Sequence, residues 1–261
     1  MEPPSPTHVG PYRLLHLLGK GGTGQVFAAV HEEMGQQVAL KLLSPDPTGD
    51  PQRFARFRQE AQILAQLQHP GVVRVFHYDR LGDTVFLAME LLRGLSLREW
   101  IQRQPPGPVP LQSALALCEQ IAAIMVDVHA QDIVHRDLKP ENVFLCPDEA
   151  AALGHHIKLL DFGIAKLRPD PGEVLNVTQV HTHESAVLGT YTHMAPEQLG
   201  GASTVDGHAD VYSLGVLAFE LLAGRAPFPY EHPYDVITAH RSELPPPLKQ
   251  LVPALPGALS A

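Results

Sequence analysis

Short apolar stretches that alternate with polar residues fill the first third of the 261-residue chain. Alternation of this kind is typical of β-strands, whose side chains point in turn to opposite faces of a sheet. The stretches lie at residues 14–18, 26–30, 37–43, 72–78 and 84–91. Between the third and the fourth stretch, residues around 54–64 carry apolar side chains at helical spacing. This order predicts five strands and one main helix, after a flexible Pro-rich lead-in over residues 1–10.

The pattern changes to that of helices in the rest of the chain. Apolar positions recur every three or four residues in 97–104, 111–129 and 210–222, and a Pro-rich loop at 105–110 separates the first two. The change falls at Leu92-Arg93-Gly94, which indicates a boundary. We therefore expect an α+β protein with a lead-in over 1–10, a sheet-rich part over 11–92 and a helical part over 93–261.

Composition and charge exclude several classes of protein. An apolar content of 44% with 18% charged residues is ordinary for a folded domain. A formal net charge of −9 argues against a nucleic-acid-binding surface. The two cysteines, Cys118 and Cys146, are too few for a disulfide framework and suit a reducing compartment. With no signal peptide or membrane span evident in the sequence, these features predict a cytoplasmic protein with no nucleic-acid partner.

A glycine-rich hexapeptide, Gly19-Lys20-Gly21-Gly22-Thr23-Gly24, matches the pattern GxGxxG. Glycine lets a backbone approach phosphate groups closely because it has no Cβ. A dinucleotide-binding fold would continue into a helix, but residues 25–30 have a strand pattern, and Asp46 lies in a Pro-flanked loop. A Walker A loop would need Lys after the last glycine, where Gln25 stands. A glycine-rich hairpin is therefore favoured.

A lysine, Lys41, ends the apolar stretch VALK at 38–41, where an unpaired ammonium group would be costly to bury. It therefore needs an anionic partner. Glu60 is the candidate, because it borders the apolar face of the helix predicted around 54–64. The alternative is that Glu60 pairs with Arg56, one turn earlier, on the solvated face of the same helix.

Three further motifs follow in the second half of the chain. They are HRDLKPEN at 135–142, DFG at 161–163 and APE at 195–197. Together with the glycine-rich segment and Lys41, this ordered set resembles the eukaryotic-type (Hanks-type) serine/threonine protein kinase family, and especially its bacterial branch. The resemblance extends from about Tyr12 to the last residue.

The resemblance implies a bilobal protein-kinase fold. Its N-lobe, a five-stranded antiparallel sheet plus one main helix, would bind ATP, and its mostly helical C-lobe would carry catalysis. The glycine-rich loop would cover the nucleotide, and Lys41, held by Glu60, would contact the phosphates. The adenine would lie against apolar side chains and bind the backbone next to the family's gatekeeper position. The residues concerned are Val26, Ala39 and Phe144, the gatekeeper Met89, and the backbone from Glu90 to Leu92.

The same resemblance assigns the chemistry to the second half of the chain. Asp137 would accept or orient the proton of the substrate hydroxyl, and Lys139 would neutralise the γ-phosphate. Asn142 and Asp161 would hold Mg²⁺, for which Mn²⁺ is an alternative. Lys139 and Thr190 resemble serine/threonine rather than tyrosine kinases. The implied activity is transfer of the γ-phosphoryl group of Mg-ATP to Ser/Thr hydroxyls of protein substrates.

Regulation by phosphorylation is implied by Arg136, which stands beside Asp137. In the family, such an arginine marks kinases whose activation segment is ordered by phosphate, because a guanidinium group binds phosphate bidentately. Thr178 and Thr182, followed by Ser185, are the candidate phosphorylation sites.

Fifteen histidines raise the alternative of a metal site. His181 with His183 and the pair His155-His156 are the closest sets. A zinc site needs further ligands on a stable scaffold, whereas these residues lie in segments with a loop pattern, so solvated histidines are favoured.

The chain departs from the family pattern in two places. Tyr191 and His193 replace a proline and an aromatic residue before the APE motif, which loosens any inference about substrate sequence. The chain also ends where family members enter their last helices, so we expect a truncated C-lobe in which Glu197 lacks an arginine partner. Two alternatives to an active kinase stay open: a pseudokinase that binds ATP as a scaffold, and an inactive truncated fragment.

Overall fold

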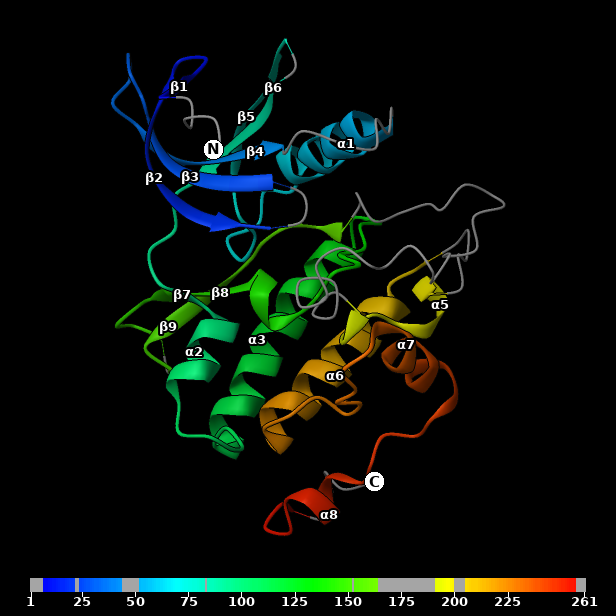
Figure 1. The fold of residues 1–261 in the computed structure, drawn as a ribbon. Helices are drawn as coiled ribbons and strands as arrows, with labels where there is room; N and C mark the ends of the chain where they lie inside the picture. The colour runs from blue at the N-terminus through cyan, green and yellow to red at the C-terminus, as the bar shows by residue number, and fades with distance from the viewer. Residues whose placement is uncertain are drawn as a thin grey trace. The chain divides into compact units, whose positions relative to one another are not determined.

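The computed structural model describes residues 7–21, 24–43, 52–82, 84–151, 153–163, 191–199 and 205–256. The chain divides into two compact units, Met1–Arg93 and Gly94–Ala261, which we call the N-terminal unit and the C-terminal unit. The division falls one residue after the predicted boundary. Figure 1 shows a sheet with one helix in the first unit and mostly helices in the second, as the sequence predicts.

Antiparallel strands form the sheet of the N-terminal unit. They are β1 (His8–Val9), β2 (Tyr12–Lys20), β3 (Gly24–His31), β4 (Gln37–Leu43), β5 (Val75–Leu81) and β6 (Thr84–Glu90). Their order in the sheet is β1-β2-β3-β4-β6-β5. The prediction of five strands missed β1, and the expectation of a flexible lead-in over 1–10 is wrong for this segment. The reason is that β1 pairs with β2 and buries Val9 in the core.

The two faces of this sheet differ. One face is apolar, and the other carries the residues that the resemblance implies in nucleotide binding. Phe27, Leu40 and Phe86 point to the first face, where Val9 and Tyr12 complete the core. Neighbouring positions on a strand point to opposite faces. The strand register pairs the residues of the second face across the sheet, Val26 with Lys41 and Ala39 with Met89.

The main helix of the N-terminal unit, α1 (Gln52–Gln66), agrees with the sequence prediction. Phe57, Ala61 and Leu64 are each no more than 2% exposed. Their spacing of three and four residues places them on one side of the helix. Glu60 lies on the same side, so the helix carries a carboxylate into the interior of the unit.

The C-terminal unit contains helices of very different length. They are α2 (Leu97–Arg103), α3 (Leu111–His129), α5 (Pro196–Leu199), α6 (His208–Ala223), α7 (Pro233–Ser242) and α8 (Leu248–Leu251). The three helices predicted from apolar spacing correspond to α2, α3 and α6. A short 3-10 helix, η1 (Pro140–Asn142), precedes the strands β8 (Val143–Pro147) and β9 (His155–Leu159). With β7 (Leu95–Ser96) these form a small antiparallel sheet in the order β7-β8-β9, which sequence reasoning missed.

Helix α3 is the one helix in the described part of the chain that is long and apolar enough to cross a membrane. It has 19 residues and a mean hydropathy of 1.4 over its best window. A core helix of a soluble protein meets the same criteria, so the expectation that the chain has no membrane span stays a prediction. Leu117, Ile121 and Val128 are fully buried in the C-terminal unit, and α3 packs against α6.

Gly24→Ala should destabilise the N-terminal unit. A Cβ at residue 24 would lie 2.0 Å from the carbonyl oxygen of Leu42 on the neighbouring strand. Because that oxygen belongs to backbone, the clash is relieved only by a shift of the strand, and we expect the free energy of unfolding to fall by about 2–4 kcal/mol. Urea unfolding followed by circular dichroism measures the change.

The matched control for this prediction is Gly19→Ala, because nothing lies within 4 Å of a Cβ at residue 19. We expect this variant to stay within about 0.5 kcal/mol of the natural chain. Equal losses from Gly24→Ala and Gly19→Ala would contradict the proposed backbone clash.

Candidate functional site

A buried ion pair joins the sheet and the helix of the N-terminal unit. Lys41 Nζ lies 3.2 Å from Glu60 Oε1, and each side chain is 4% exposed. The ammonium group also lies 5.8 Å from the centre of the Phe57 ring. The predicted partnership of Lys41 with Glu60 is thus confirmed, and the burial of Glu60 contradicts the alternative that it faces solvent.

The glycine-rich segment forms a hairpin between β2 and β3, as predicted. Lys20 pairs with Gln25, and the amide of Gly21 donates a 2.8 Å hydrogen bond to the carbonyl oxygen of Gly24. Open space surrounds the position of a Cβ at Gly19 and at Gly21. Bare backbone at these positions suits close approach to phosphate groups. Gly22 and Thr23 lie outside the described residues.

The other nucleotide residues implied for this unit lie near Lys41 on the sheet. Ala39 and Met89 are cross-strand neighbours, and each is 7% exposed. The amide of Glu90 donates to the carbonyl oxygen of Arg74, which fixes the backbone at the end of β6. Leu92 follows as a half-buried residue. The N-terminal unit therefore offers an apolar surface beside a buried cation.

In the C-terminal unit, Asp137 is the centre of a compact polar cluster. Lys139 Nζ lies 3.1 Å from Asp137 Oδ2, and Asn142 Nδ2 donates to the same oxygen at 2.9 Å and to the Asp137 carbonyl oxygen at 2.8 Å. The side chain of Asp137 is 11% exposed. Two donors on one oxygen favour the ionised carboxylate and fix its direction.

The Asp161-Phe162-Gly163 segment is tied to this cluster by backbone. Gly163 donates to the His135 carbonyl oxygen at 2.7 Å, and the Phe162 ring stacks on His135 with 4.4 Å between centroids. A Cβ at Gly163 would lie 2.8 Å from the Cβ of Asp137, so only glycine fits. Burial lowers the pKa of His135, which keeps its ring neutral and suited to stacking.

The donor set around Asn142 and Asp161 fits a hard cation. The Leu160 amide donates to the Asn142 carbonyl oxygen at 2.9 Å, which holds the two chain segments together. Both side-chain bonds of Asn142 to Asp137 use Nδ2, so its Oδ1 is the side-chain atom that could bind a cation. An amide oxygen and the Asp161 carboxylate match Mg²⁺, which takes few protein ligands beside water and phosphate. Phe144, which the resemblance places against the adenine, lies on β8 and is half-buried.

A zinc site is not supported by the described histidines. The described part of the chain contains no group of three or more His, Cys, Asp and Glu side chains able to hold a metal ion. The His155 ring packs near Trp100, and His156 Nδ1 lies 3.4 Å from Asp148. His181 and His183 lie outside the described residues.

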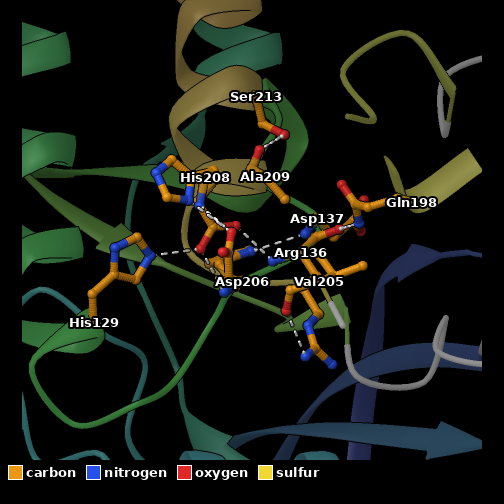
Figure 2. A network of polar contacts seen from close by, with 11 residues as sticks. His129, Arg136, Asp137, Gln198, Val205, Asp206, His208, Ala209 and Ser213 are labelled. Carbon is orange, nitrogen blue, oxygen red and sulfur yellow. Dashed lines mark hydrogen bonds and ion pairs between the residues drawn. The ribbon is translucent and has the colours of Figure 1, made fainter. Parts of the chain in front are cut away.

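The carboxylate of Asp210, on α6, binds the backbone of the segment that leads to Asp137, which we call the catalytic loop (residues 135–142). Its Oδ2 accepts hydrogen bonds at 2.8 Å from the His129 ring and from the His135 amide, and its Oδ1 accepts one at 2.7 Å from the Arg136 amide. Asp210 is 2% exposed. Figure 2 shows how His129, at the end of α3, points to this network. The resemblance to protein kinases already implied this supporting role for Asp210, at the start of the helix predicted over 210–222.

The Arg136 peptide is held from both sides in a left-handed conformation. Its φ is 64°, which non-glycine residues rarely adopt. Asp210 binds its amide, and Gln198 Nε2 donates to its carbonyl oxygen at 2.8 Å. The guanidinium group donates to the Val205 carbonyl oxygen at 3.1 Å, and its buried Nε has no hydrogen-bond partner among the described residues. The candidate phosphorylation sites Thr178, Thr182 and Ser185 lie outside the described residues, and so does Thr190.

A second network, which sequence reasoning missed, surrounds Glu220 on α6. Arg98 on α2 forms an ion pair with Glu220 and binds Glu141 at 2.7 Å, and His193 Nε2 lies 3.0 Å from Glu220. The His193 contact is close but not aligned as a hydrogen bond. Burial alone would raise the pKa of Glu220, but His193 and Arg98 outweigh burial and lower it to about 2. The network connects Glu141, beside Asn142, with the segment before the APE motif.

Comparisons with known proteins identify the family of the chain. Residues 12–251 match the model of the protein kinase domain. The chain is 39% identical to serine/threonine-protein kinase pkn2 of Myxococcus xanthus and 37% identical to PknA of Mycobacterium tuberculosis, with 94% of the chain covered in each case. It spans 28% and 54% of the length of these two relatives.

Solved structures give the same result. The crystal structure of the Mycobacterium tuberculosis PknI kinase domain is similar with a TM-score of 0.69 and 27% identity. The match covers 95% of this chain and 84% of that chain.

Asp210→Asn should destabilise the C-terminal unit. The replacement keeps the shape of the side chain. In the natural chain both carboxylate oxygens accept hydrogen bonds, whereas in the variant one of these atoms is an amide nitrogen, which cannot accept them. We expect the free energy of unfolding to fall by about 2–4 kcal/mol, because backbone amides lose a charged acceptor in the interior. The control is Asp206→Asn, whose side chain is 71% exposed and where we expect about 0.5 kcal/mol or less. Equal values in urea unfolding would contradict the role of Asp210.

Glu220→Gln should flatten the acid side of the stability profile. The folded-state pKa of about 2 lies below the ordinary value of 4.5. The ionised form therefore stabilises the fold fully above about pH 4.5, and this contribution, about 3 kcal/mol, is lost as the pH falls toward 2. Urea unfolding between pH 2 and 6 measures it. Glu231→Gln, an exposed charge change, is the control, and an unchanged slope in Glu220→Gln would contradict the prediction.

Proposed function

This chain belongs to the protein kinase family, and from that premise we propose that it transfers the γ-phosphoryl group of ATP to serine and threonine hydroxyls of proteins. The observation that carries the proposal is the cluster in which Lys139 and Asn142 both bind Asp137 Oδ2. It places the proposed base Asp137, the positively charged Lys139 and the candidate metal ligand Asn142 within one short loop. Phosphoryl transfer needs these groups because it depends on positioning and on balance of charge.

Asp137 is the proposed base for the substrate hydroxyl. Its carboxylate is held by Lys139 and Asn142, so it keeps one direction without a large movement on substrate binding. Lys139 lies close enough to share its charge with a phosphoryl group that arrives beside Asp137. Asn142 thereby has two tasks, since its amide nitrogen orients Asp137 and its amide oxygen faces a cation.

ATP recognition is proposed for residues of both units. In the N-terminal unit, Lys41 would bind the phosphates, with Glu60 to keep its ammonium group in place. The exposed backbone at Gly19 and Gly21 leaves room for phosphate oxygens. The candidate apolar contacts for the adenine are Val26, Ala39 and Met89 in the N-terminal unit and Phe144 in the C-terminal unit.

Mg²⁺ is the proposed cation, and Asn142 with Asp161 would hold it. When bound, this ion neutralises phosphate charge. Asp161 is brought to Asn142 by the backbone bond from Leu160, and its φ of 35° shows a conformation that the surrounding bonds must maintain. These two residues are therefore the proposed ligands of a hard cation.

Substrate choice and setting are inferred from charge and from cysteine chemistry. Acidic and basic residues are equal in number over residues 1–93, so the whole acidic excess of the chain lies in the C-terminal unit. An acidic surface favours basic protein substrates.

Both cysteines are free, which supports a reducing, cytoplasmic setting. Arg136 is the proposed receptor for a phosphate on Thr178 or Thr182.

A noncatalytic scaffold has no specific observation in its favour. Such a protein would be expected to lack a basic, acidic or metal-binding residue of the site, whereas Lys41, Asp137 and Asp161 are all present.

Asp137→Asn should reduce phosphoryl transfer by about 10²- to 10⁴-fold, because the hydroxyl loses its base. The measurement is transfer of labelled γ-phosphate from ATP to a generic basic protein, with Asp127→Asn on the exposed side of α3 as the control. Equal rates in the two variants would rule out Asp137 as the base.

If the natural chain transfers no phosphate in the same assay, a second measurement is needed. Thermal unfolding with and without Mg-ATP then separates the alternatives, because a ligand that binds the folded state raises the melting temperature. Stabilisation without transfer would favour an ATP-binding scaffold, and the absence of a cooperative transition would favour an unstable fragment.

A further inference from the structure

His240 is a buried histidine of α7 that joins three parts of the C-terminal unit. It is 5% exposed. Its Nδ1 lies 2.7 Å from the hydroxyl of Tyr212 on α6, and its Nε2 lies 3.1 Å from the carbonyl oxygen of Thr192. The rings of Phe228 and Tyr212 pack edge-on against it, with centroids 5.0 Å and 5.7 Å away.

The partners of His240 select one tautomer. A carbonyl oxygen only accepts hydrogen bonds, so Nε2 must carry the proton and donate it to Thr192. Nδ1 then accepts from the Tyr212 hydroxyl. Burial lowers the pKa of His240 to about 4 and outweighs the hydrogen bond to Thr192, which raises it, so the ring is neutral at pH 7. Both ring nitrogens are thereby satisfied without a net charge.

The segment that contains Thr192 is connected by hydrogen bonds to the loop that carries Asp137. Thr192 is followed by Ala195, whose amide donates to Gln198 Oε1 at 3.1 Å. Gln198 in turn donates to the carbonyl oxygen of Arg136, the residue before Asp137. A protein chain that presents a hydroxyl to Asp137 must therefore pass beside the segment 191–198. A shift of this segment would change how such a chain fits and leave the groups that act on the nucleotide in place.

We propose that His240 is a positioning residue for the protein substrate, which acts by fixing the Thr192 carbonyl and with it the segment 191–198 beside Asp137. The proposal rests on the proposed kinase function. Among the described residues of the C-terminal unit, His240 contacts Tyr212, Thr192 and Phe228 and not Asp137, Asn142 or Asp161. Its effect therefore falls on the KM of the protein substrate and not on that of ATP. The same geometry makes α7 the element through which the segment is supported.

The test compares His240→Leu with His240→Gln. Leucine fills the space and has no donor, whereas glutamine has an N–H group that can replace the Nε2 donor. For His240→Leu we expect the KM of the protein substrate to rise about tenfold, the effect of one lost hydrogen bond, with the KM of ATP unchanged. His240→Gln should recover most of the loss. His232→Gln, an exposed histidine before α7, is the control.

Amide hydrogen exchange provides a readout that is independent of activity. Residues 191–199 should exchange about tenfold faster in His240→Leu than in the natural chain, while α3 and α6 keep their protection, which shows that the variant is folded. Tyr212→Phe leaves the Nε2 donor in place and removes only the hydroxyl that donates to Nδ1. It should give a smaller increase of the same kind.

The outcomes separate the two proposals. A natural chain that transfers no phosphate overturns the kinase function and the substrate role of His240 together. An active natural chain in which His240→Leu changes both KM values equally, or leaves exchange of 191–199 unchanged, overturns the role of His240 alone. Failure of His240→Gln to recover the KM would also overturn it, because the donor would then not be the decisive feature.

Discussion

The buried carboxylate of Asp210 is the interaction on which the catalytic part of the C-terminal unit depends. A charge removed from water is stable only where donors replace the solvent, and here two backbone amides and the His129 ring do so. These bonds hold Arg136 at a positive φ that costs about 1–3 kcal/mol when unsupported. Because Asp137 follows this constrained peptide, the direction of the proposed base is determined by a residue far along the chain.

The N-terminal unit applies the same rule to a cation. Lys41 is buried on a strand whose neighbours are apolar, and it is tolerated because α1 brings Glu60 to it. Loss of either partner would leave an uncompensated charge, which costs about 3–5 kcal/mol. In the N-terminal unit the buried cation Lys41 is itself proposed to bind ATP, whereas in the C-terminal unit the buried anion Asp210 supports the residue proposed to act on the protein substrate.

The segment before and within the APE motif connects several of these charges. Gln198 binds the backbone beside Asp137, His193 lies against Glu220, and His240 holds the Thr192 carbonyl. Glu220 leads through Arg98 to Glu141, in the same short helix as Asn142. The polar groups that support the proposed substrate surface and those that support the proposed metal site therefore share partners on α2 and α6.

The sequence by itself determined the elements with a clear period and the motifs with a known order. It led to the main strands, to α1, α3 and α6, and to Asp137, Asn142 and Asp161, because each signal lies within a few neighbouring residues. Only the tertiary structure decided that Glu60 turns inward, that strands of two and five residues form a second sheet, and that Glu220 and His240 matter. Their partners come from distant segments, Arg98 and Glu220 being 122 residues apart, and spacing along a chain does not encode which buried polar groups meet.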